Sequence, residues 1–96
     1  MNVEFSWDDS KAISNQKKHG ISFEEAKTVF YDDYARVIHD PDHSIDEDRF
    51  IILGMSSFFH ILVVVHCYRD SDTNIRIISA RKASTIESKH YQGYLP

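Results

Sequence analysis

Leu62-Val63-Val64-Val65 is the stretch of this chain that decides the fold, because as a strand it would present no polar residue on either face. A strand that alternates apolar and polar residues has one face in water, whereas an uninterrupted apolar run is typical of a strand covered on both faces. The run lies inside a longer strand candidate, Phe58 to Tyr68. The sequence therefore predicts a sheet in which this segment is the central strand.

Four further strands are predicted, three before this segment in the sequence and one after it. Their β-branched and aromatic residues are bounded by polar clusters, which is typical of strands separated by turns. The turns are expected at Ser56-Ser57 and at Asp70 to Asn74. The five strand candidates are Val3 to Trp7, Tyr34 to His39, Arg49 to Met55, Phe58 to Tyr68 and Ile75 to Arg81, with a polar loop at Asp40 to Asp48.

Two helices are predicted near the N-terminus from the residues that begin and end them. Asp8 is suited to cap the first helix, and Gly20 is suited to end it in the left-handed conformation. Ser22 and Glu25 have the spacing of a capping box for the second helix, which ends near Tyr31. The two helices are therefore joined by a tight corner.

A final helix is predicted from Ser84 and Glu87, which repeat the capping-box spacing, through about Tyr91. The order of elements is then strand, two helices, four strands and helix. This order predicts a single α+β domain over residues 1–96, in which two N-terminal helices and one C-terminal helix pack on an antiparallel sheet.

The composition narrows the class of protein. No apolar run approaches the ~20 residues needed to span a bilayer, and the N-terminus lacks the basic head and apolar stretch of a secretory signal. The single cysteine, Cys67, lies in an apolar run where a small buried hydrophobic residue is expected. These features predict a cytoplasmic protein that does not contact a membrane.

The charge is unevenly distributed along the chain, whose net charge is −4. Residues 1–65 hold six Lys and Arg against twelve Asp and Glu, whereas residues 66–96 hold five against three. A phosphate-binding site is therefore expected to involve the C-terminal third. The acidic remainder suits a basic protein partner better than a nucleic acid.

A set of short motifs keeps its order across nearly the whole chain. They are Trp7-Asp8, Lys11-Ala12, Asn15, Lys18 to Ala26, Asp40-Pro41-Asp42-His43-Ser44, Arg49, Gly54 to Ser57, Leu62 to Val65, and Arg76 to Ala83 with Glu87 and Tyr91. Together these motifs resemble the BrnT toxin family. One departure is Asp9, where the family usually has proline, and it affects helix entry rather than chemistry.

The resemblance implies a RelE-like fold and a ribonuclease toxin of a type II toxin–antitoxin system, neutralised by a BrnA-type antitoxin. In that family the complex represses its own promoter and the antitoxin supplies the DNA contacts, so DNA is expected to be bound only indirectly. Such a toxin inhibits growth and translation by cleaving RNA without a metal or other cofactor, through attack of the RNA's own 2′-hydroxyl. The alternative is a non-catalytic, protein-binding regulatory module, in which the cations fix a partner's carboxylates.

Lys18 and His19 have two interpretations. Cations in the last turn of a helix before a capping glycine are favoured by the helix dipole, which is a purely structural role. In the catalytic interpretation His19 transfers protons and Lys18 stabilises charge on the phosphate, because histidine titrates near neutrality and lysine supplies a fixed charge.

Arg76 and Arg81 are the expected phosphate ligands, since a guanidinium matches the geometry of a phosphate and stays charged. In a regular strand they would face opposite sides. They share a site only if the strand ends or bulges between them, for instance near Ser79-Ala80; otherwise Arg76 pairs with a carboxylate and Arg81 alone belongs to the site. Arg49, Lys82 and Tyr91 are the further residues expected to bind the substrate, with packing on the sheet as the alternative for Tyr91.

No metal site is expected. His60 and His66 share one face of a strand, but about 20 Å separates residues six positions apart in a strand, which is too far for two ligands of one ion. Each is expected to be a structural histidine. The segment His39 to His43 is rich in ligand atoms, but it lacks the glycine and the closing glutamate of a calcium loop and is expected to be a solvated loop.

Overall fold

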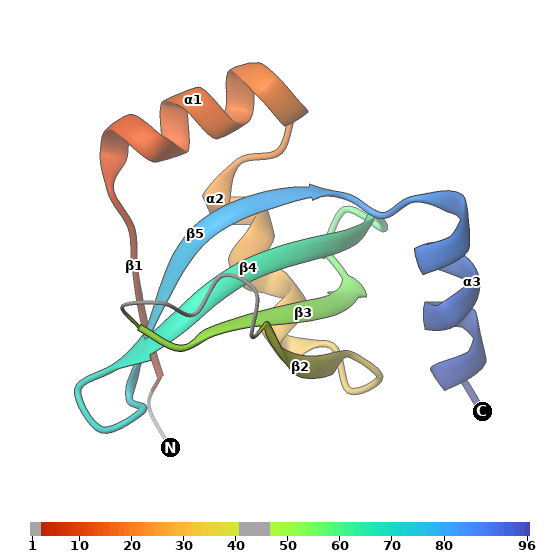
Figure 1. Cartoon of the computed structure of the whole chain (residues 1–96). Helices are drawn as coiled ribbons and strands as arrows, with labels where there is room; N and C mark the ends of the chain where they lie inside the picture. Colours follow the sequence, from red (N-terminus) through yellow and green to blue (C-terminus); the bar gives the residue numbers. More distant parts are fainter. Residues whose placement is uncertain (1–2, 41–46) are drawn as a thin grey trace.

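The computed structural model describes residues 3–40 and 47–96, and its elements follow the predicted order (Figure 1). The strands are β1 (Glu4–Ser6), β2 (Arg36–Asp40), β3 (Arg49–Met55), β4 (Ile61–Arg69) and β5 (Asn74–Lys82). The helices are α1 (Asp9–His19), α2 (Phe23–Ala26), the 3-10 helix η1 (Lys27–Tyr31) and α3 (Thr85–Tyr94). Residues 41–46 of the predicted polar loop, including most of His39 to His43, lie outside the described residues. No described helix is long and apolar enough to cross a membrane.

The strands form one sheet in the order β1-β5-β4-β3-β2, so the apolar run of β4 is central as predicted. The pairs β2–β3, β3–β4 and β4–β5 are antiparallel, whereas β1 pairs with β5 in parallel. The expectation of a purely antiparallel sheet was therefore wrong. No hairpin joins β1 to β5, so no turn imposes an antiparallel direction. The parallel direction carries the chain toward the end of β5, where α1 lies.

The core lies between one face of the sheet and the helices α1, α2 and η1. Figure 1 shows α1 alongside β5 and α2 behind the sheet, whereas α3 stands apart at the end of β5. The buried core consists of Ile21, Phe23, Ala26, Val29, Ile52, Leu62, Val64, Ile77 and Ala80, with Phe5, Trp7, Ala12, Phe30 and Ala35 packed against it. Cys67 is a free, buried cysteine as expected, with 2% of its surface exposed.

β1 pairs with only the first part of β5, and farther along the same edge of β5 a side chain of α1 takes the place of a strand. The amide of Asn15 donates to the carbonyl of Ala80 at 2.8 Å and accepts from the Ala80 N–H at 3.0 Å, as a neighbouring strand would. The same amide donates to the Ile21 carbonyl at 3.1 Å. A buried amide that satisfies two backbone groups of the strand both fixes α1 and closes this edge.

The predicted capping signals hold at three positions and fail in part at one. Asp8 caps α1, Gly20 ends it in the left-handed conformation, and Ser84 with Glu87 forms a complete capping box on α3. Ser22 accepts the Glu25 N–H, but the Glu25 side chain turns into the protein and does not cap. After one turn, the second helix continues as the 3-10 helix η1.

Candidate functional site

Arg76 and Arg81 lie on the same face of β5 because the strand contains a bulge. Arg81 pairs with Val63 of β4 and Arg76 pairs with Cys67, while Ile78 has no partner in β4. The extra residue changes the parity of the strand between the two arginines. The bulge that the sequence analysis required is therefore present. Val63 and Cys67 are about 13 Å apart along the strand, so the arginines share a face but do not reach one phosphate.

The face that carries these arginines is turned away from the core, and every arginine of the chain is on it. Leu62 and Val64 belong to the core, so the alternating residues of β4 and their partners point the other way. The strand register places Arg36, Arg49, Arg69, Arg76 and Arg81 on this side, which we call the arginine face. This face gathers guanidinium groups from four strands, of which Arg69 is paired with Glu47 at 3.1 Å and Arg81 with Glu87 at 2.7 Å.

A cavity of about 240 Å³ lies where α3 meets the arginine face. Four strands form its floor and α3 forms one wall. We call it the α3 cavity, and its lining residues are Arg36, Ile38, Ile51, Leu53, Val63, Arg81, Glu87, His90 and Tyr94. It combines an apolar floor with a few convergent polar groups, which is typical of a ligand site.

Arg81 and Glu87 form the central polar contact of the α3 cavity. The guanidinium donates two hydrogen bonds to the carboxylate, from Nη1 at 2.7 Å and from Nη2 at 2.9 Å. These bonds lower the pKa of Glu87 to about 2, and they raise the pKa of Arg81. Nε of Arg81 has no acceptor among the described residues, so this edge of the guanidinium is available to a phosphate.

Three further groups complete the cavity. The Arg36 guanidinium lies 5.0 Å from the centre of the Tyr94 ring, which ties the end of α3 to β2 through a cation–π contact. His90 is exposed, and on α3 it stands three residues after Glu87 and four before Tyr94. This spacing puts all three side chains on one side of the helix. The cavity thus offers two guanidinium groups, a carboxylate and an imidazole to one ligand.

The family of the chain follows from comparison with known proteins. Residues 7–87 match the family described as the ribonuclease toxin BrnT of type II toxin–antitoxin systems. The chain belongs to this family. Among solved structures, the Brucella abortus ribonuclease toxin BrnT aligns with a TM-score of 0.66 and 23% identity, over 88% of this chain and 100% of that one. At this identity the likeness shows the shared fold alone. No curated protein sequence matches.

The other cations predicted for the site of this BrnT-family toxin do not line the α3 cavity. Lys18 and His19 are in the last turn of α1, which Asn15 holds to the outer edge of β5. Lys82 pairs with Leu62 and so points to the helix-covered side. Arg49 is on the arginine face opposite Asp40, outside the cavity. The structure thus groups Arg81 with α3 and leaves these four residues elsewhere.

Tyr91 of the toxin anchors α3 to the body of the protein. Its side chain is 2% exposed, and its hydroxyl donates to Asp32 Oδ2 at 2.6 Å. Burial and the neighbouring carboxylate raise the pKa of Tyr91 to about 12. This geometry matches the packing interpretation.

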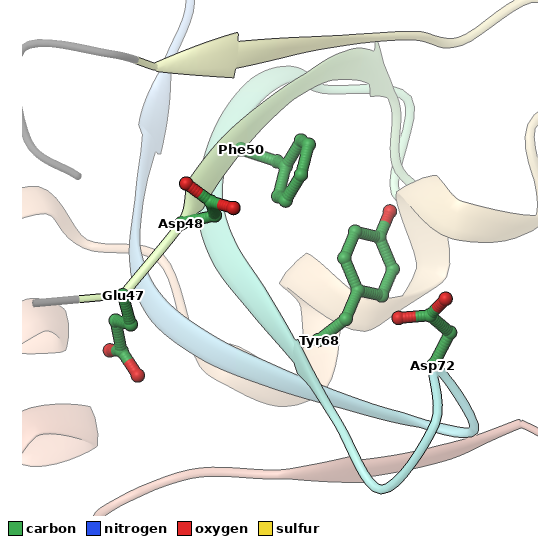
Figure 2. A pocket seen from close by; sticks show the side chains of 5 residues that line it. All are labelled: Glu47, Asp48, Phe50, Tyr68 and Asp72. Atoms are coloured by element: carbon green, nitrogen blue, oxygen red, sulfur yellow. The ribbon is translucent and has the colours of Figure 1, made fainter.

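A second pocket of the toxin, of about 480 Å³, is chemically unsuited to RNA (Figure 2). Figure 2 shows Phe50 and Tyr68 side by side, with Glu47 and Asp48 on one side and Asp72 on the other. These five residues line the pocket, and three of them are carboxylates while none is a cation. A phosphate backbone would be repelled there.

Sequence reasoning missed three residues of the α3 cavity in this toxin and gave only one of the two contacts of a fourth. Arg36, His90 and Tyr94 were not predicted as site residues. Glu87 caps α3 as expected, but its second contact, with Arg81, was not predicted. The available signal was the spacing of Glu87, His90 and Tyr94 on one helix face. Arg36 had no signal, since only the sheet register brings it beside α3.

Proposed function

We propose that this toxin is an endoribonuclease that cleaves RNA in the α3 cavity by a metal-independent reaction. The observation that carries the proposal is the meeting of Arg81, Glu87, Arg36 and His90 in one cavity on the arginine face. In this reaction the RNA's 2′-oxygen attacks the adjacent phosphorus and the bond to the 5′-oxygen breaks. The products are a 2′,3′-cyclic phosphate and a 5′-hydroxyl. The enzyme must accept one proton, donate another and stabilise the pentacovalent phosphorus.

The roles follow from the chemistry of each group. Arg81 and Arg36 bind the phosphate oxygens and stabilise the charge that develops on them. Glu87 is a positioning residue, because its low pKa makes it a poor base and its two hydrogen bonds fix the plane of Arg81. His90 is the proton-transfer group, since an imidazole has one ring nitrogen that can accept a proton and one that can donate a proton. Arg76 and Arg49 bind flanking phosphates along the arginine face.

The other predicted residues keep a defined place in the proposal. His19 and Lys18, at the end of α1 and outside the α3 cavity, are the alternative groups for proton transfer and charge stabilisation. Lys82 is a candidate for RNA contact, whereas the buried Tyr91 supports the cavity by holding α3 to Asp32. A BrnA-type antitoxin neutralises the toxin and supplies any DNA contacts, and the toxin acts in the cytoplasm, where its RNA substrate is. The two hydrogen bonds between Arg81 and Glu87 also suit the non-catalytic binding module, in which the cation belongs to an ion pair.

The test is RNA cleavage by purified, antitoxin-free toxin, with naked RNA and in a translating extract. We compare wild type with Arg81→Ala, His90→Ala and His19→Ala, and use Lys89→Ala as the control, because Lys89 is exposed beside His90 but outside the cavity. Loss of the proton-transfer group should slow cleavage about 10²- to 10⁴-fold. Slow cleavage by His90→Ala, with normal cleavage by Lys89→Ala and His19→Ala, would support the α3 cavity as the site of RNA cleavage. Intact RNA with folded wild-type protein in both conditions would favour the binding module.

A further inference from the structure

We propose that the antitoxin docks in an aromatic groove on the side of α3 next to the α3 cavity, through a segment that is apolar with flanking lysines or arginines. The groove has a volume of about 660 Å³ and lies between η1, the β3–β4 turn and α3. Its apolar lining consists of Tyr31, Tyr34, Met55, Phe59, Tyr91 and Leu95, and we call it the aromatic groove. The proposal rests on the toxin having an antitoxin partner, but not on where RNA is cleaved.

Phe59 is the residue that most needs a partner. Its ring is 83% exposed, and its backbone has a φ of 64°, a conformation that is strained for a bulky side chain. Asparagine or glycine would adopt this turn conformation at lower cost. The exposed ring gains no core contact that offsets the strain. Strained residues of this kind are concentrated at functional surfaces, and an exposed aromatic ring is typical of a binding anchor.

The turn that presents Phe59 is fixed by hydrogen bonds to a buried carboxylate. The buried carboxylate of Glu25 accepts hydrogen bonds from Ser56 Oγ at 2.6 Å and from His60 Nδ1 at 2.7 Å. Ser56 Oγ in turn accepts from the Phe58 and His60 N–H groups at 3.2 and 3.3 Å. Because the turn is already ordered, a partner does not have to order it on binding. Phe58, 65% exposed, extends the apolar surface beyond the groove.

The charge of the groove selects a protein rather than RNA. Aromatic side chains could stack on bases, but a polynucleotide also needs cations along its backbone. Among the described residues, no lysine, arginine or histidine lines the groove, and the one charged lining residue is Asp32. Asp33 is exposed next to it. An apolar peptide segment with lysine or arginine at its margins is complementary to this surface.

The groove and the α3 cavity share α3 as a wall. Tyr91 and Leu95 face the groove, whereas Glu87, His90 and Tyr94 line the cavity. A segment in the groove would therefore contact the helix that positions Arg81 through Glu87. This arrangement gives antitoxin binding a direct physical route to the proposed RNA site.

The test is the affinity of purified cognate antitoxin for toxin variants, measured by calorimetry, together with RNA cleavage by each free variant. Phe59→Asp is compared with Ile13→Asp, since Ile13 is also exposed (58%) but lies on α1. Both changes place a carboxylate at a solvent-exposed position. We expect Phe59→Asp to weaken antitoxin binding at least about 30-fold, with unchanged RNA cleavage, and Ile13→Asp to change neither.

A second variant guards against misfolding. Phe59→Asn suits the left-handed turn better than phenylalanine does, so it should raise the melting temperature while it also weakens antitoxin binding. Equal antitoxin affinity of both Phe59 variants and wild type would overturn the proposal. So would a loss of RNA cleavage with unchanged antitoxin affinity, which would make the groove an RNA surface. A wild-type dimer that the Phe59→Asp change dissociates, with antitoxin affinity unchanged, would assign the groove to a second copy.

The two proposals fail separately. If free wild-type toxin leaves RNA intact but antitoxin binding depends on Phe59, the ribonuclease site is wrong and the docking surface stands. If RNA is cleaved in the α3 cavity but antitoxin binding is indifferent to Phe59, the reverse holds.

Discussion

The Tyr91 hydroxyl donates a 2.6 Å hydrogen bond to Asp32, and this bond joins α3 to the segment that follows η1. Asp32 Oδ2 also accepts the Met55 N–H at 2.8 Å, so one carboxylate links α3 with β3. The helix that carries one wall of the α3 cavity is therefore attached through a charge-assisted hydrogen bond as well as through Arg81 and Arg36. This attachment has consequences for stability and activity.

Tyr91→Phe should lower the free energy of unfolding by about 1–2 kcal/mol, because it removes a hydrogen bond to a charged acceptor and leaves the ring in place. Urea unfolding measures the change. Tyr94→Phe is the matched control, since the Tyr94 ring packs under Arg36 through its face rather than its hydroxyl. Equal losses in both variants would show that the bond to Asp32 does not hold α3.

Arg81→Ala and Arg76→Ala should affect different kinetic constants. Removal of Arg81, in the α3 cavity, should lower kcat about 10²- to 10³-fold, as loss of a group that stabilises the transition state does. Removal of Arg76, about 13 Å away along β5, should raise KM and leave kcat nearly unchanged. Initial rates on a short RNA check both variants. A fall in kcat for Arg76→Ala would place it in the reaction centre.

The stability of the toxin should fall between pH 6.5 and pH 4 because of His66. Burial lowers the pKa of His66 from 6.5 to about 4, and its neutral ring donates to the Val64 carbonyl. The unfolded chain binds a proton that the folded protein does not bind, so acidification in this range favours unfolding. Above pH 6.5 the stability from this residue is complete. Below about pH 4 its contribution falls no further.

His66→Phe should remove this pH dependence, since phenylalanine fits among the neighbouring rings of Phe30 and Phe50. Wild type should lose about 2 kcal/mol of unfolding free energy between pH 7.5 and pH 5. The variant should lose much less over the same range. Urea titrations at the two pH values give the comparison. A variant as sensitive to pH as wild type would exclude His66 as the cause.

Gly54→Ala should destabilise the protein by about 1–3 kcal/mol, because a methyl group there overpacks the core. Its Cβ would lie 2.7 Å from the Ala35 Cβ and 3.3 Å from Asp32 Oδ2. Gly93→Ala is the control, since nothing lies within 4 Å of its added Cβ and alanine favours a helix. Thermal unfolding should show a lower melting temperature for the first variant and an equal or higher one for the second.

The apolar pattern was sufficient to predict most of the fold. The run at Leu62 to Val65 placed the central strand, and the residues that cap the helices marked where α1 and α3 begin. The direction of β1 could not be predicted, because β1 and β5 are far apart in the sequence and no turn joins them. The hydrogen bonds of Glu25 to Ser56 and His60 could not be predicted either, since the same carboxylate could cap its own helix or bind a distant partner.

The candidate site was predictable only in part, and the reason is geometric. Arg81 stood out in the sequence as a cation beside an apolar strand. In the structure, the unpaired residue Ile78 forms the bulge that puts Arg81 and Arg76 on the same face. The neighbours of Arg81 come from β2 and from successive turns of α3. Arg36 and His90 are separated by more than half of the chain, and no local pattern connects them.

The pairing of β1 with β5 brings Glu4 opposite Asn74, and the α3 cavity needs residues from Arg36 to Tyr94. A chain that emerges from the ribosome N-terminus first can form the β1–β5 pair only after β5 has been made, and the cavity only after α3 has been made, because contacts so distant in sequence form late. A nascent chain of this toxin therefore has no assembled site for RNA. On the proposed function, the ribosome that makes the toxin meets an active nuclease only after α3 has emerged and packed on the sheet.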